Sequence, residues 1–107
     1  MNKKLIKGTS SRPRLCVYRS NKHIYAQIII DSKKSSSTLV ACSTIEKDIR
    51  YIIKNNNCDS AKFIGKTLAE RCLARNIKQV IFDTNDYLYH GKVKALAESA
   101  RETGLIF

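Results

Sequence analysis

Residues 14–31, RLCVYRSNKHIYAQIIID, decide the fold of this chain. Residues 14–19 are a short apolar run with charged ends, and residues 23–31 are rich in the β-branched and aromatic side chains that favour strands. Between them, residues 20–22 (SNK) supply the polar side chains that are typical of a turn. The segment therefore predicts a β-hairpin.

The sequence that follows the hairpin continues the sheet. After the polar residues 31–37, residues 38–43 (TLVACS) have the composition of a third strand. Three strands joined by short loops form an antiparallel meander. Residues 79–82 (QVIF) are another short apolar run, so we expect a fourth strand near the end of the chain.

Helical patterns occupy much of the remaining sequence. Residues 43–46 (STIE) fit a capping box, which predicts a short helix over residues 44–53. A longer helix is expected from about Asp59 to Asn76, and a last helix should end at Gly104. Their apolar stripes consist of Ala61, Ile64, Gly65, Leu68 and Cys72 in the longer helix and of Val93, Leu96, Ala97 and Ala100 in the last one.

This order of elements predicts an α/β fold with a mixed sheet. A strand, a crossover helix and a further strand make a parallel pair, so the last strand should lie beside one of the meander strands. Helices covering such a sheet give a sandwich of two or three layers. We expect one α/β domain over residues 12–107, preceded by a flexible basic arm over residues 1–11.

Length and composition exclude several classes of protein. A chain of 107 residues with 43% hydrophobic side chains makes one compact domain. No apolar run approaches the roughly 18 residues of a membrane span, and residues 1–11 lack the apolar core of a signal peptide, so we expect a soluble protein that stays where it is made. The four cysteines match no zinc or redox spacing, and we expect reduced structural thiols.

The net charge of +11 is concentrated in the first third of the chain. Residues 1–34 hold nine basic side chains and one acidic one, which gives +8. Residues 35–75 sum to +3, and residues 76–107 sum to zero. Such a local excess attracts a polyanion, so nucleic acid is the expected partner; the alternative is a solvated surface without a partner.

Catalytic patterns are absent from the sequence. Two-metal phosphodiester cleavage needs converging carboxylates, and the candidates Asp31, Glu70, Asp83 and Asp86 are not expected to meet. Neither histidine belongs to a recognisable nucleophile–base set, and the four glycines are isolated, which excludes phosphate-binding glycine loops. We therefore expect a protein that is not an enzyme and has no cofactor or metal; a metal-dependent nuclease is the rival hypothesis.

Two local clusters suit RNA. The first surrounds the hairpin, where Arg, Lys, His and Tyr side chains can bind phosphates and stack on bases. Its members are Arg12, Arg14, Arg19, Ser20, Asn21, Lys22, His23 and Tyr25. The alternative for this cluster is solvated arginines and a Tyr25 that packs on the sheet.

The second cluster leads into the last helix. Gly91 permits a close backbone approach, and the first-turn amides with Lys92 and Lys94 can bind a phosphate. The alternative is that Tyr87 and Tyr89 are packing anchors and that His90 merely starts the helix.

Three stretches resemble a known family. They are SNKHIYAQ (20–27), ACSTIEK (41–47) and YHGKVKALAESARETGLIF (89–107). In this order they resemble the bacterial and plastid form of large-subunit ribosomal protein eighteen, the 5S rRNA-binding family, over nearly the whole chain. The resemblance implies a structural ribosomal protein that binds 5S rRNA and helps attach it to large-subunit rRNA in the central protuberance, beside neighbouring ribosomal proteins.

The resemblance also implies an α/β/α sandwich of ribonuclease-H-like architecture without the catalytic carboxylates. Carried over by position, the hairpin contacts are Arg19, Ser20, Asn21, Lys22, His23 and Tyr25, and the helix-start contacts are Tyr89, His90, Gly91 and Lys92. The full set of expected RNA-binding residues adds Lys3, Lys4, Lys7, Arg12, Arg14, Lys33, Lys34 and Lys94.

The sequence departs from the family pattern in two places. Only Lys3, Lys4 and Lys7 precede the domain, where family members usually carry a longer, Arg-rich arm. Thr84 and Asp86 stand where the family often has Arg and Gly, so this turn is expected to face away from RNA. Ile, Lys and Asn together make up 33 of 107 residues, which suggests A/T-biased codons and a plastid or bacterial ribosome.

A small-subunit ribosomal protein of similar fold is the alternative among binding proteins.

Overall fold

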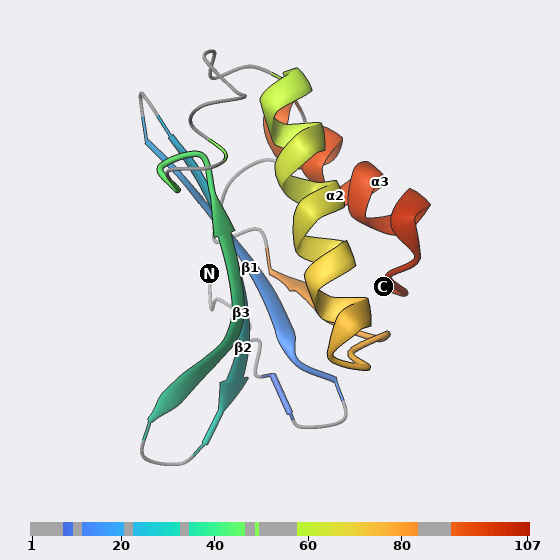
Figure 1. The fold of residues 1–107 in the computed structure, drawn as a ribbon. Coiled ribbons are helices and arrows are strands. Elements are labelled where there is room, and N and C mark those ends of the chain that lie inside the picture. The colour runs from blue at the N-terminus through green and yellow to red at the C-terminus, as the bar shows by residue number, and fades with distance from the viewer. Residues whose placement is uncertain are drawn as a thin grey trace, which may run out of the picture.

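The computed structural model describes residues 8–9, 12–20, 23–32, 35–46, 49, 58–83 and 91–107. Four strands and two helices have defined bounds within this part of the chain (Figure 1). They are β1 (Arg14–Arg19), β2 (Ile24–Asp31), β3 (Ser36–Ser43), α2 (Cys58–Ala74), β4 (Ile81–Asp83) and α3 (Lys92–Thr103).

The strands form one mixed sheet in the order β3-β2-β1-β4. Strands β1, β2 and β3 pair antiparallel, as the meander predicts. Strand β4 pairs parallel with β1, so that Arg14 lies opposite Ile81 and Cys16 opposite Asp83. The expected mixed sheet and the parallel position of the last strand are confirmed.

Alternation along the strands separates a core face from an open face. Leu15 and Val17 of β1 belong to the buried core, together with Ile24, Ala26 and Ile28 of β2. Because successive side chains of a strand point to opposite faces, Cys16, Tyr18, Tyr25 and Gln27 lie on the other face.

Both described helices lie on one side of the sheet (Figure 1). Helix α2 buries Ala61, Ile64, Leu68 and Cys72, and α3 buries Val93, Leu96, Ala97 and Ala100, which are the expected stripes. Of the three layers that the family resemblance implies, the described residues supply the sheet and one helical layer. No helix in this part of the chain is long and apolar enough to cross a bilayer.

A close helix contact explains one glycine. A Cβ added to Gly65 of α2 would collide with the carbonyl oxygen of Leu96 in α3. The absence of a side chain at this position lets the two helices approach backbone to backbone, which places both of them over the sheet.

The edge strand β3 is closed by side chains. Arg71 donates to the carbonyl oxygen of Ala41 at 2.7 Å, and Arg75 donates to that of Leu39. Glu46 accepts from the Ser43 N–H at 2.8 Å and pairs with Arg71 at 3.0 Å. An unpaired strand edge invites another strand to pair with it, and here arginine and glutamate occupy part of that edge.

The helix expected over residues 44–53 is only partly described. The carboxylate of Glu46 does reach back to the Ser43 N–H, as in a capping box, but residues 44–46 form a turn. Ile49 is helical and buried, and residues 50–53 lie outside the described residues. The strand expected over residues 79–82 is formed by Ile81–Asp83, because Gln79 pairs instead with Ile106 at the end of the chain.

The start of the described chain is fixed to the sheet. The Gly8 N–H donates to the Asp31 carboxylate at 2.7 Å, and the Asp31 N–H donates to the Gly8 carbonyl at 2.8 Å. Gly8 is buried, and a Cβ there would collide with the Ile29 carbonyl. Within the segment expected to form a flexible arm, residues 1–11, reciprocal hydrogen bonds thus hold Gly8 against β2.

Candidate nucleic-acid interface

The turn between β1 and β2 is organised by Ser20 and His23. The Ser20 N–H donates to the His23 carbonyl at 2.8 Å, and the Ser20 hydroxyl accepts from the His23 N–H at 3.1 Å. Arg19 and Ser20 are exposed at this end of the sheet. The hairpin thus presents a guanidinium and a hydroxyl on a backbone that is fixed by its own hydrogen bonds.

The His23 ring is positioned by a buried threonine. Its Nδ1 lies 3.1 Å from Oγ1 of Thr44, and that oxygen accepts the Ile24 N–H at 3.0 Å. When the Thr44 hydroxyl donates to Nδ1, the neutral ring carries its proton on Nε2, where it can donate to a ligand. The His23 and Tyr25 ring centroids are 6.3 Å apart.

Arg14 is held in an ion-pair network. Its Nε and Nη2 atoms donate to the two Asp31 oxygens, each at 3.1 Å, and its Nη1 donates to Asp83 at 3.0 Å. The Arg14 side chain is only 17% exposed. The guanidinium that we expected to contact RNA therefore has all three nitrogens engaged within the protein.

The same network sets the charge state of Asp31. The hydrogen bond from the Gly8 N–H, with further ones from the Ser36 hydroxyl and from Arg14, lowers the pKa of Asp31 to about 2. The carboxylate is therefore ionised at neutral pH and balances the Arg14 charge.

Two of the four carboxylates considered in the sequence analysis, Asp31 and Asp83, bind the same guanidinium. The sheet register brings both carboxylates to Arg14, because Asp83 lies beside Cys16 and Asp31 ends the strand next to β1. A guanidinium occupies the position between them. Among the described residues, no group of three or more His, Cys, Asp or Glu side chains is arranged to hold a metal ion.

The first sequence cluster divides between two ends of the sheet. Arg12 and Arg14 lie at the start of β1, whereas Arg19 ends that strand and His23 precedes β2. Five residues of strand separate Arg14 from Arg19 by about 17 Å. Ser20, His23 and Tyr25 share the hairpin end with Arg19, and Arg12 is exposed at the opposite end.

The second cluster lies at the start of α3. Gly91 has φ 60° and precedes a first turn without acidic residues. Lys92 is half-buried, and Lys94 is exposed and lies 3.9 Å from Glu98. In Figure 1 the start of α3 lies toward the same end of the molecule as the turn between β1 and β2.

The other expected contacts lie outside the described residues. They are Lys3, Lys4, Lys7, Asn21, Lys22, Lys33, Lys34, Tyr89 and His90.

Sequence reasoning missed two side chains of the open face. Tyr18 is directly opposite Tyr25 in the β1–β2 register, and Gln27 is opposite Cys16. Both follow from period-two alternation once the register is known, but the hairpin sequence alone left that register open.

The buried cysteines are inert thiols. Burial raises the pKa of Cys42 to about 12 and that of Cys72 to about 11. Both side chains belong to the core, and Cys16 is also fully buried. These three thiols therefore serve as small apolar side chains, as expected.

Comparison with known proteins identifies the relatives of this chain. The model of the family described as ribosomal L18 of archaea, bacteria, mitochondria and chloroplasts matches residues 1–107. The large ribosomal subunit protein uL18c of Guillardia theta is 54% identical over 103 residues, which cover 95% of this chain and 94% of the relative.

Two further relatives give the same result. The uL18c protein of Porphyra purpurea is 52% identical and the uL18 protein of Trichodesmium erythraeum is 55% identical, each over 98% of this chain and 87% of the relative. All three are named as proteins of the large ribosomal subunit, which disfavours the small-subunit alternative.

Proposed function

The chain belongs to the ribosomal protein L18 family, and from this premise we propose that it binds 5S rRNA and helps attach it to the large-subunit rRNA in the central protuberance. Its setting is the large ribosomal subunit of a plastid or a bacterium, as for its relatives, and its role there is structural rather than enzymatic. Its other partners are neighbouring proteins of the large subunit.

The proposal is supported by the group of side chains at the hairpin end of the sheet. Arg19, Ser20, His23 and Tyr25 meet there on a fixed turn, within the third of the chain that carries +8. The start of α3, whose first turn contains Lys92 and no acidic residue, lies toward the same end of the molecule. Cations, hydrogen-bond donors and rings on one surface suit phosphates, 2′-hydroxyls and unstacked bases.

Binding of this kind depends on salt. If about six phosphates are neutralised, the logarithm of the affinity for 5S rRNA falls against the logarithm of salt concentration with a slope of roughly −4 to −5. Filter binding of the full chain to 5S rRNA, with small-subunit rRNA fragments as competitor, measures both the slope and the preference. A flat salt response, or equal affinity for the two RNAs, contradicts the proposal.

A triple variant tests the hairpin end directly. Arg19→Ala, Lys22→Ala and His23→Ala together should weaken 5S rRNA binding by several kcal/mol, at about 1–2 kcal/mol for each charge-assisted contact. The matched control is Lys66→Ala with Lys78→Ala, which removes two exposed cations elsewhere and should change affinity little. If both variants weaken binding equally, the effect comes from net charge and the site is not at the hairpin.

A further inference from the structure

The open face of the sheet carries a row of rings at its hairpin end. Tyr18 of β1 and Tyr25 of β2 are paired directly, so both rings lie on the face opposite the helices. Tyr18 is 39% exposed. The plane of the His23 ring is tilted by 60° to that of Tyr25, beside which it lies. Three rings of one hairpin thus gather on this face.

Tyr18 and Cys16 lie two residues apart on the same face of β1. Cys16 is fully buried there, whereas Tyr18 is exposed at the hairpin end. A tyrosine side chain has only two rotatable bonds, so its ring loses little conformational freedom when a planar ligand stacks on it.

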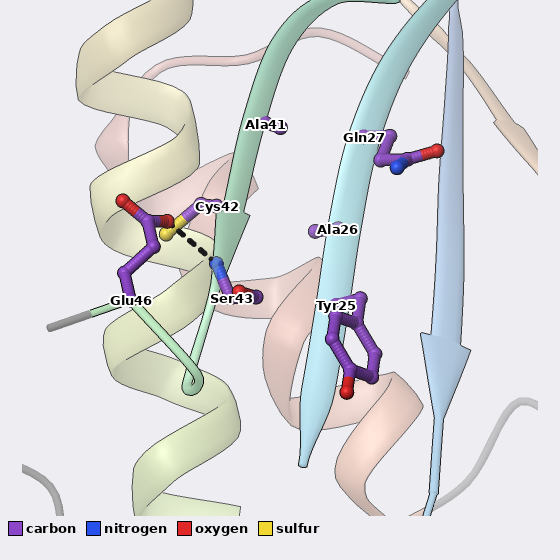
Figure 2. A pocket seen from close by; sticks show the side chains of 7 residues that line it. All are labelled: Tyr25, Ala26, Gln27, Ala41, Cys42, Ser43 and Glu46. Carbon is purple, nitrogen blue, oxygen red and sulfur yellow. Dashed lines mark hydrogen bonds between the residues drawn. The ribbon is translucent and has the colours of Figure 1, made fainter. Parts of the chain in front are cut away.

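A pocket of about 240 Å³ lies beside Tyr25 on strands β2 and β3 (Figure 2). It is smaller than the pockets that hold drug-sized ligands, and its size suits a single planar ring system. Figure 2 shows Cys42 and Glu46 on the side of β3 nearer α2, and Tyr25 and Gln27 on the far side. The described lining residues are Tyr25, Ala26, Gln27, Ala41, Cys42, Ser43 and Glu46.

The charge of the pocket favours a base over a phosphate. Among the described lining residues Glu46 alone carries a charge, and its carboxylate would repel a phosphate. Arg71 and the Ser43 N–H already bind that carboxylate. The amide of Gln27 offers both donors and an acceptor to a neutral base edge.

We propose that this face binds unpaired bases of the RNA. One base stacks on Tyr25 and enters the pocket, where the Gln27 amide hydrogen-bonds its edge, and the neighbouring base stacks on Tyr18. This inference rests on the proposed function, because it assumes an RNA ligand. Base stacking on aromatic side chains is how proteins recognise single-stranded segments of folded RNA.

Alanine and phenylalanine variants of the full chain separate stacking from other effects. Tyr18→Ala and Tyr25→Ala should each weaken 5S rRNA binding about 5- to 150-fold, the range measured for one stacked base. Tyr18→Phe and Tyr25→Phe keep the ring and should stay within about threefold of the unchanged chain. The salt slope should be the same for all of them, because no phosphate contact is lost.

The outcomes distinguish this inference from the proposed function. If the unchanged chain does not bind 5S rRNA, the proposed function itself is wrong. If it binds and the alanine variants bind equally well, the stacking face is wrong. Phenylalanine variants as weak as the alanine variants would assign the effect to the hydroxyl and also overturn the inference.

A second measurement does not depend on the folding of variants. Ultraviolet crosslinking of the unchanged chain to 5S rRNA, followed by mass spectrometry, should place nucleotide adducts on Tyr18 or Tyr25. Adducts confined to other peptides would contradict the inference. So would crosslinks in assembled subunits that join these tyrosines to a neighbouring ribosomal protein.

Discussion

At the scale of single residues, Arg14 illustrates how context redirects a side chain. Its place beside Pro13 and Arg12 in a basic stretch indicated an RNA contact. The structure surrounds it with Asp31 and Asp83 and leaves it 17% exposed. An arginine with two carboxylates at hydrogen-bond distance has its charge balanced inside the protein, so its contribution is to hold β1, β2 and β4 together.

Asp31 makes this network sensitive to acid. Its pKa is about 2 in the folded chain against about 3.8 unfolded, so the stabilisation is complete above about pH 5 and is lost as pH falls through about 2. A shift of this size corresponds to about 2 kcal/mol of unfolding free energy. Urea unfolding at pH 6, 4 and 3 should show this loss.

Asp31→Asn should be less stable than the unchanged chain at pH 6. Its unfolding free energy should also fall less between pH 6 and pH 3. Glu102→Gln, at an exposed position of α3, is the control and should show the same fall as the unchanged chain. An Asp31→Asn variant with unaltered acid dependence would mean that another group is responsible.

At the scale of elements, the contact between α2 and α3 depends on Gly65. A methyl group there meets the Leu96 carbonyl, and a backbone atom cannot swing aside as a side chain does. Gly65→Ala should therefore lower the unfolding free energy by about 2–3 kcal/mol, although alanine normally favours a helix over glycine. Thermal unfolding measures the change.

Lys66→Ala is the matched control, since it alters the next, exposed residue of the same helix and should be nearly neutral. A Gly65→Ala variant as stable as this control would mean that the two helices can move apart without lowering the free energy of unfolding, which would contradict the prediction.

The secondary structure followed from the sequence wherever local pattern and burial agree. Strand β1 has its predicted bounds, and the predicted stripes of α2 and α3 are buried. Strand β4 starts at Ile81 and not at Gln79 as predicted, because Gln79 pairs with Ile106, a contact between segments that no local pattern reveals. The turn at residues 44–46 shows the same limit, since a capping box also fits a tight turn after a strand.

At the scale of the whole molecule, the basic residues form more than one surface. Arg12 and Arg19 are close in the sequence and were therefore assigned to one cluster. Strand β1 lies between them, so they are at opposite ends of the sheet. The network of Arg14, Asp31 and Asp83 escaped prediction for the same reason, because only the register of three strands brings these residues together.

This separation predicts additive effects on RNA binding. Arg12→Ala and Arg19→Ala should each weaken 5S rRNA binding by about 1–2 kcal/mol, and the double variant should lose the sum within about 0.5 kcal/mol, because the two sites lie too far apart to share a partner. Filter binding of the unchanged chain, the two single variants and the double variant gives the coupling energy between the two arginines. A coupling above about 1 kcal/mol would indicate that both arginines contact one RNA element. If Arg12→Ala binds 5S rRNA as tightly as the unchanged chain, the RNA contact is restricted to the hairpin end.

The anchoring of Gly8 by Asp31 has a geometric consequence for the lysines that precede it. Five residues of fully extended chain span about 17 Å, so the backbone of Lys3 stays within that radius of a fixed point beside the end of β2. Under the proposed function, any RNA phosphate that Lys3 binds must therefore lie within reach of this point.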